Sequence, residues 1–175
     1  MTRPEGFAVW ITGIPAAGKS TLARELVRKL NERGIYPAVL ESDVMRAVLT
    51  PEADYGSDER DRFYRQLADI GAMLAAQGLP VIFDATANRK AYRDRARSLI
   101  RRFIEVYVQC PVETCRQRDP KGIYAAAVRG TASNVPGIQA SYEPPPSPEV
   151  TVDGTTDPRQ SADAILHYLV AMHNI

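Results

Sequence analysis

The stretch "GIPAAGKST", Gly13 to Thr21, decides the fold of this chain. It fits the pattern G-x-x-x-x-G-K-[ST], follows the apolar run "FAVWIT" at 7–12 and leads into the amphipathic run "LARELVRKL" at 22–30. The two pattern glycines permit backbone turns that direct successive N–H groups at phosphate oxygens, and the helix that follows adds its positive end. Strand, loop and helix together predict a binding loop for a nucleoside triphosphate.

Each polar residue of this loop has an expected partner on the nucleotide. Lys19 would reach the β and γ phosphates, and Ser20 would hold the Mg²⁺ that accompanies ATP. We therefore expect Mg²⁺ as the cofactor and ATP as the phosphoryl donor. The residues expected to bind ATP in this loop are Gly13, Ala16, Ala17, Gly18, Lys19, Ser20 and Thr21.

The composition is that of an ordinary globular protein. The chain has 175 residues, 45% of them apolar and 25% charged, which predicts one domain over residues 1–175. Its net charge of +1 gives no field that favours nucleic acid or an anionic membrane. No run approaches the ~20 apolar residues of a membrane span, and the N-terminus lacks the pattern of a signal peptide. We expect a cytoplasmic protein with neither nucleic acid nor membrane as partner.

Short apolar runs alternate with longer amphipathic segments, which is typical of a parallel sheet with helices on both faces. The predicted fold is therefore a three-layer α/β/α domain with a five-stranded parallel sheet. Expected strands cover residues 7–12, 37–41, 79–85, 103–109 and 150–152. Expected helices cover residues 19–33, 58–77, 89–102, 112–118 and 158–173. The segment from Asp119 to Pro148 holds six of the thirteen prolines and little periodicity, so we expect it to form a lid.

A small-molecule kinase fits this organisation better than the other nucleotide-binding classes. We find no N-K-x-D motif of a GTPase, and a motor ATPase has a longer chain. A lid suits a kinase because phosphoryl transfer requires that water be kept from ATP. An ATP-binding regulatory module without turnover is the alternative from another class, but a decayed enzyme would be expected to lose one of four polar residues that remain: Lys19, Ser20, Asp43 and Lys121.

Two further segments resemble the adenylylsulfate kinase (APS kinase) family of P-loop kinases. The stretch "LESDVMR" at 40–46 is similar to the family's L-D-G-D-N-V-R. The stretch "RDPKGIY" at 118–124, with "NVPGIQASYEPP" at 134–145, is similar to R-D-P-K-G-L-Y and N-F-T-G-I-D…Y-E-x-P. The lid residues that match in register are Arg118, Asp119, Pro120, Lys121, Gly122, Tyr124, Gly130, Asn134, Gly137, Ile138, Tyr142 and Glu143.

This resemblance implies ATP-dependent phosphorylation of the 3′-hydroxyl of adenylyl sulfate, which gives phosphoadenylyl sulfate for sulfate assimilation. It places Lys19, Asp43 and Lys121 in catalysis and Arg118 against the adenine of ATP. Asp43 and Arg46, three residues apart, would share one face of a helical turn toward the phosphate loop. The family is commonly dimeric, which makes a homodimer an expectation by analogy. The residues implied to bind the acceptor are Asp43, Arg46, Tyr55, Arg60, Phe63, Lys121, Ile123, Tyr124 and Val135.

The chain departs from the family where the acceptor would bind. Two aromatic residues of the family sandwich the acceptor's adenine; here Tyr55 keeps one place, but Val135 replaces the other. The family's D-R-x-x-N-x-R-R reads "ERDRFYRQ" at 59–66, so that Phe63 stands in place of Asn. Since a base–aromatic stack contributes ~1–3 kcal/mol, another nucleotide-like or anionic small molecule is the alternative acceptor.

A last departure concerns the stretch "FDATAN" at 83–88, where the family has F-I-S-P. This stretch is similar to the D-x-T-N segment of polynucleotide-kinase-like enzymes, which makes polynucleotide 5′-kinase activity a further alternative. The balanced charge and the small-molecule lid argue against it. Asp84 at a strand end would either hold Mg²⁺ through water or cap the next turn, because strand ends in open α/β sheets face the ligand crevice.

Overall fold

The computed structural model of the protein describes residues 5–52, 54–173 and 175. Five parallel strands form one sheet in the order β2-β3-β1-β4-β5, which confirms the predicted α/β fold class. β3 is shorter than the predicted 79–85, whereas the ends of the other four strands differ from the predicted ends by one residue at most. The strands are β1 (Ala8–Thr12), β2 (Ala38–Glu41), β3 (Val81–Asp84), β4 (Phe103–Gln109) and β5 (Val150–Asp153).

The central strand β1 is buried on both faces, and its alternating side chains enter two separate cores. Val9 and Ile11 belong to a cluster built with the helices on one side of the sheet. Trp10 belongs to the cluster on the other side, where its ring stacks on Phe83 at a centroid distance of 4.4 Å. The indole N–H of Trp10 donates to the Ala85 carbonyl at 3.0 Å, so this buried ring leaves no unpaired donor.

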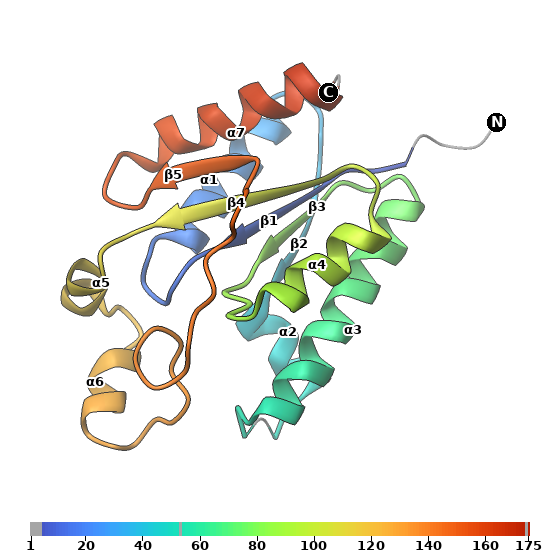
Figure 1. Cartoon of the computed structure of the whole chain (residues 1–175). Helices are drawn as coiled ribbons and strands as arrows, with labels where there is room; N and C mark the ends of the chain where they lie inside the picture. The colour runs from blue at the N-terminus through green and yellow to red at the C-terminus, as the bar shows by residue number, and fades with distance from the viewer. Residues whose placement is uncertain (1–4, 53, 174) are drawn as a thin grey trace.

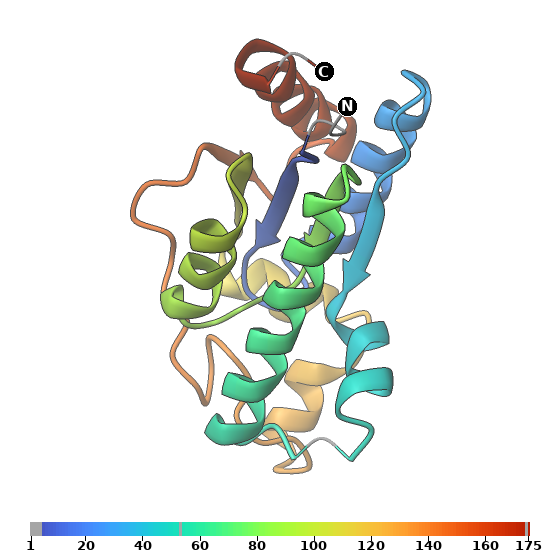
Figure 2. The same cartoon turned by 90° about the vertical axis from the view of Figure 1, so that its right-hand side faces the viewer.

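Four long helices cover the two faces of the sheet, as Figures 1 and 2 show. α1 (Lys19–Asn31) packs beside α7 (Pro158–His173) on one face. α3 (Ser57–Ala76) packs beside α4 (Lys90–Leu99) on the other. α4 ends before the predicted residue 102, because Ile100 is extended and buried and turns the chain into β4.

Three short helices lie at the carboxyl edge of the sheet: α2 (Ser42–Leu49), α5 (Val112–Arg118) and α6 (Ile123–Val128). α2 and α6 were not among the predicted elements. Each is too short to show a helical period in the sequence, and α6 is built largely from alanine, which favours helix without marking a buried face.

The topology brings the loops after all five strands to one edge. Because every strand is parallel, the phosphate loop after β1, α2 after β2, the loop after β3 and α5 after β4 lie beside one another (Figure 1). α6 lies further out beyond α5. Within the described part of the chain, no helix is both long and apolar enough to cross a membrane.

Candidate active site

A cavity of about 580 Å³ opens at the carboxyl edge of the sheet. Its floor is the phosphate loop from Pro15 to Thr21, and its walls come from the loops that follow the other strands. Of the residues predicted to bind ATP, the cavity is lined by Ala16, Ala17, Gly18, Lys19, Ser20, Thr21 and Arg118.

The loop holds the backbone geometry that its glycines permit. Gly13 has φ +155° and Gly18 has φ +106°. A Cβ at position 13 would lie 2.7 Å from the Val108 carbonyl oxygen, so a glycine is needed there for the loop to pass β4. Gly13 therefore shapes the loop from behind, and it does not line the cavity. α1 begins at Lys19, so its free N–H groups face the cavity floor.

Lys19 is the buried cation of this floor. Lys19 is 9% exposed, and its ammonium donates to the Ile14 carbonyl at 3.0 Å. Burial lowers the pKa of Lys19 to about 8, against the opposing attraction of Asp84. A phosphate placed in the loop would act as a negatively charged counter-ion for this buried ammonium.

Asp43 and Lys121 meet at the cavity wall. Asp43 lies in the first turn of α2, and Lys121 lies between α5 and α6. The Lys121 ammonium donates to the Asp43 carboxylate in an ion pair whose side chains are 53% and 57% exposed. Burial lowers the pKa of Lys121, but the hydrogen bond and charge of Asp43 outweigh it, and the net shift is upward. Two of the three predicted catalytic groups thus lie together.

Asp84 is the buried carboxylate of the cavity. It ends β3, is 4% exposed and lines the cavity beside Thr86. The Thr12 hydroxyl donates to the Thr86 carbonyl at 2.6 Å, which fixes the loop that carries both residues. Ser20 and Asp84 offer the hard oxygen donors that Mg²⁺ prefers, so the side chains present fit the predicted metal.

The loop between β5 and α7 closes the nucleotide side of the cavity, a contribution that the sequence analysis missed. Gly154 lies so close to the phosphate loop that a Cβ there would be 2.4 Å from the Ala17 carbonyl oxygen. Arg118 donates from Nη1 to the Gly154 carbonyl at 2.8 Å, so the residue expected beside the ATP adenine lies against this loop. The rule that strand ends face the crevice could have identified it.

The residues expected to bind the acceptor divide into two groups. Asp43, Lys121 and Ile123 line the cavity, and Tyr124 supports it from behind by donating its hydroxyl to the Pro15 carbonyl at 2.8 Å. The other group lies beside the cavity, between α2, α3 and the segment around residue 134, and consists of Arg46, Tyr55, Arg60, Phe63 and Val135.

The expectation that Asp43 and Arg46 share a face toward the phosphate loop is wrong. Asp43 faces the cavity, whereas Arg46 turns to α3 and pairs with Glu59. A separation of three residues places two side chains about 60° apart around a helix, and in α2 this is enough to direct them to different neighbours. Phe63 and Val135 are 0% and 4% exposed, and the ring of Tyr55 is the exposed aromatic of the group.

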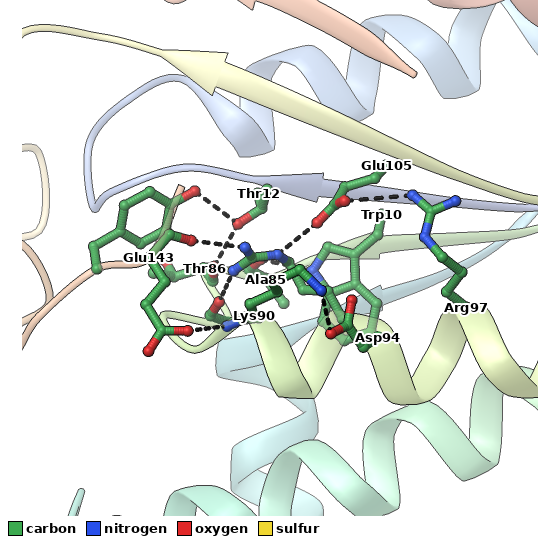
Figure 3. Close-up of polar contacts among 12 residues, drawn as sticks. Trp10, Thr12, Ala85, Thr86, Lys90, Asp94, Arg97, Glu105 and Glu143 are labelled. Carbon is green, nitrogen blue, oxygen red and sulfur yellow. Dashed lines mark hydrogen bonds and ion pairs between the residues drawn. The ribbon is translucent and has the colours of Figure 1, made fainter. Parts of the chain in front are cut away.

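The last part of the expected lid is fastened to the loop after β3 and to α4 (Figure 3). Asn88 donates to the Ser141 carbonyl at 2.9 Å, and the Glu143 amide donates to the Asn88 carbonyl at 2.8 Å. The Glu143 carboxylate accepts from the Lys90 amide at 2.7 Å. The buried Arg93 donates to the Glu143 carbonyl, also at 2.7 Å. These bonds fix the end of the segment from Asp119 to Pro148.

The phosphate loop at the end of β1, the 2-3-1-4-5 parallel sheet and the carboxylates at the ends of β2 and β3 define a P-loop kinase. The sequence pattern described as adenylylsulphate kinase matches residues 5–153. The chain therefore belongs to the adenylylsulphate kinase family, as the resemblance indicated.

Individual relatives agree with this assignment. The adenylyl-sulfate kinase of Thermodesulfovibrio yellowstonii is 38% identical over 168 residues, which cover 94% of this chain and 84% of that protein. The adenylyl-sulfate kinase of Halothermothrix orenii is 37% identical, covering 97% and 92%. Among solved structures, the APS kinase of Mycobacterium tuberculosis in complex with AMPPNP and APS superimposes with a TM-score of 0.89 at 32% identity, covering 95% of this chain and 98% of that one.

Proposed function

We propose that this protein transfers the γ-phosphoryl group of ATP to the 3′-hydroxyl of adenylyl sulfate and so makes phosphoadenylyl sulfate and ADP. The observation that carries the proposal is the meeting of Asp43 and Lys121 on the wall of a cavity whose floor is the phosphate loop. A carboxylate and an ammonium so placed can orient an alcohol and offset charge on the phosphoryl oxygens. The named activity of the family's relatives supports adenylyl sulfate as the acceptor.

Each cavity residue then has a chemical task. Lys19 and the start of α1 bind the phosphates of ATP, and Arg118 with the loop at Gly154 holds the adenine end. Ser20, with Asp84 through water, would hold Mg²⁺, which when bound offsets negative charge on the phosphates. Segment 119–148 would act as a lid that keeps water from the cavity.

The transfer step requires that Asp43 exchange partners. Its carboxylate first accepts a hydrogen bond from the acceptor's hydroxyl and then takes that proton, while the hydroxyl oxygen forms a bond to the γ phosphorus and the bond from that phosphorus to the leaving oxygen of ADP breaks. Lys121, released from Asp43, is placed to follow the charge on the transferring group. In the structure as described, the two side chains hold each other.

A different anionic alcohol is the second candidate acceptor, and a specific observation favours it. The aromatic residue that would form one side of an adenine sandwich is replaced by Val135, which is 4% exposed. The remaining side is Tyr55 alone, with 46% of its surface exposed. A polynucleotide acceptor has less support, because several arginines of the basic stretch in α4 are paired with carboxylates: Arg95 with Asp69, and Arg97 with Glu105 and Glu149.

The test measures ADP release by the purified protein with Mg·ATP, with and without micromolar adenylyl sulfate, and identifies the nucleotide product. We expect strong stimulation and a 3′-phosphorylated product. The 3′-deoxy analogue of adenylyl sulfate is the matched control, because it can fill the site but offers no hydroxyl. If adenylyl sulfate neither binds nor stimulates while ATP binds, the acceptor is another anionic alcohol, and cytidine and uridine conjugates are the next to test.

Three wider properties belong to the same proposal. We propose that residues 1–175 act as one kinase domain, that the protein works in the cytoplasm, and that it forms a homodimer as its family commonly does. Size-exclusion chromatography with light scattering at micromolar concentration tests the last point, and a monomer would contradict it.

A further inference from the structure

The Arg46 guanidinium lies in a buried pocket of three aromatic rings, those of Tyr55, Phe63 and Tyr64, which is called the seat below. Its central carbon is 4.0 Å from the centroid of the Phe63 ring, 4.9 Å from that of Tyr55 and 5.9 Å from that of Tyr64. Arg46 is 8% exposed, so water contributes little to its solvation. The rings favour a cation but do not replace a counter-ion, and a buried arginine therefore requires an anion.

Glu59 supplies that anion from α3. Its Oε1 accepts from Arg46 Nη1 in an ion pair whose side chains are 10% and 5% exposed. The second carboxylate oxygen, Oε2, is buried and has no hydrogen-bond partner among the described residues. Glu59 stands where the family's pattern has Asp, and the resemblance implied no role for it.

A second guanidinium shares the seat. Arg60, beside Glu59 at the start of α3, is 8% exposed and donates to the Asn134 carbonyl. Burial lowers the pKa of Arg60, and the charge of Arg46 lowers it further. The seat thus contains two guanidinium groups, Arg46 and Arg60, and one carboxylate, Glu59, which leaves an excess of one positive charge beside the cavity.

We propose that Glu59 is a specificity-determining residue of the acceptor site, which sets the charge of the Arg46–Arg60 seat and competes with ligand anions for it. The proposal rests on the proposed function, with Arg46 and Arg60, which the resemblance implies to bind the acceptor, holding its anionic group. With Glu59 present, an anion that binds at Arg46 and Arg60 is attracted by a net charge of only +1. It must also displace the Glu59 carboxylate from Arg46 or share Arg46 with it. A simple anion such as inorganic sulfate gains too little for this exchange, whereas an acceptor held also by its base and ribose does not depend on the seat alone.

The position of Tyr55 supports this arrangement. Its φ is +58°, a left-handed conformation that is strained for a bulky aromatic residue, and it stacks on Arg46 from the side that faces solvent. The Asp54 carboxylate accepts from the Gly56 amide at 2.7 Å and stabilises the turn around it. The turn holds the Tyr55 ring over the Arg46 guanidinium, on the same cation that pairs with Glu59.

The experiment measures binding of inorganic sulfate to the Glu59→Gln variant and to the wild type. Mg·ADP fills the phosphate loop throughout, because that loop also binds anions, and chloride keeps the ionic strength constant. We expect the variant to bind sulfate about tenfold more tightly or better, which corresponds to about 1.4 kcal/mol. Thermal stability should then rise with sulfate in the variant more than in the wild type. In the variant, sulfate should also become a competitive inhibitor against adenylyl sulfate. It should raise the KM of adenylyl sulfate without lowering kcat.

Glu105→Gln is the matched control, because Glu105, in β4, is also a buried carboxylate paired with arginine. Of its two partners, Arg93 is 1% exposed and is held by two carbonyls as well, and Arg97 keeps its pair with Glu149, so neither is left for sulfate. Both variants should lose stability, since each leaves a buried cation with fewer partners. Only Glu59→Gln should regain it with sulfate.

If Glu59→Gln fails to fold, Arg46→Met and the double variant Arg46→Met/Glu59→Gln replace it, since an ion pair can be exchanged for neutral groups without a buried charge. The double variant should bind sulfate at Arg60 more tightly than Arg46→Met does. Equal sulfate affinities in either comparison would overturn the proposal. The sulfate readout does not use the acceptor, so an absence of turnover with adenylyl sulfate would reject the proposed function and leave this inference standing.

Discussion

The ammonium of Lys121 donates to the carboxylate of Asp43, across 78 residues of sequence, and closes the cavity wall between α2 and the segment that precedes α6. The pair joins the first turn of α2 to the segment expected to act as a lid. It therefore couples the position of the segment to the availability of Asp43 as a base.

Asp43→Asn tests this coupling. We expect kcat to fall by about 10²-fold or more, in the range of a lost general base, while the Kd of ATP changes little because the phosphate loop is untouched. Steady-state turnover and calorimetric ATP binding measure the two quantities. Asp94→Asn removes an exposed carboxylate that pairs with Lys90 far from the cavity and serves as the control. Turnover within a factor of a few of wild type would show that Asp43 does not act on the acceptor.

Proton uptake should accompany nucleotide binding near pH 8 to 9. Burial lowers the pKa of Lys19 to about 8, so the free protein loses this proton below the usual pKa of lysine. Bound phosphates stabilise the charged ammonium, and binding should therefore take up a proton above pH 8 and weaken as the pH rises further. Calorimetry in two buffers of different ionisation enthalpy measures the uptake.

The unliganded protein should show the opposite sign in its stability. Between about pH 8 and the pKa of an exposed lysine, the unfolded chain holds the Lys19 proton and the native state does not, so this residue's contribution makes stability rise with pH in that window. Lys19→Met should remove both the proton uptake and this contribution. Uptake that persists in Lys19→Met would assign the proton to another group.

Val135→Phe restores the aromatic residue of the family at this position. If adenylyl sulfate is the acceptor, its KM should fall by about fivefold or more, because a base–aromatic stack contributes about 1–3 kcal/mol, and the KM of ATP should stay constant. Since Val135 is buried, thermal melting must show that the larger side chain is accommodated. An unchanged or higher KM in a stably folded variant would indicate an acceptor without an adenine at this site.

Gly154→Ala should weaken ATP binding. The added Cβ would lie 2.4 Å from the Ala17 carbonyl oxygen, so either the phosphate loop or the loop after β5 must shift. We expect a loss of about tenfold in ATP affinity, as for a displaced phosphate-binding backbone. Gly34→Ala is the control: it has no heavy atom within 4 Å, so its strain at φ +75° should cost stability and leave ATP affinity unchanged. ATP affinity equal to wild type in Gly154→Ala would remove this loop from the site.

The sequence predicted those parts of the protein that local chemistry dictates. The phosphate loop is specified by glycines, a lysine and a serine at fixed spacing, and the five strands by apolar runs, so both follow from neighbours in the chain. The short helices α2 and α6 left no period to detect. The β5–α7 loop could be placed at the ligand edge by the rule for strand ends, but its close packing of Gly154 on Ala17 is tertiary and no local pattern encodes it.

The acceptor region shows a different limit of sequence reasoning. Arg46 and Asp43 are close in sequence, yet their environments depend on which helix packs against α2. Glu59 carries no signal of its own because an acidic residue at a helix start is common. Its importance comes from burial beside Arg46, which only the fold reveals.

The bonds that fasten Tyr142 to β1 and Glu143 to α4 bear on the order in which ligands leave the enzyme. If segment 119–148 acts as a lid, the part near Tyr142 and Glu143 that is held to β1 and α4 would be the fixed end of its motion. Such a motion would separate Lys121 from Asp43 and expose the acceptor side, while the β5–α7 loop that follows would stay in place beside the phosphate loop. Phosphorylated product would thus depart before ADP, an ordered release that product-inhibition patterns reveal.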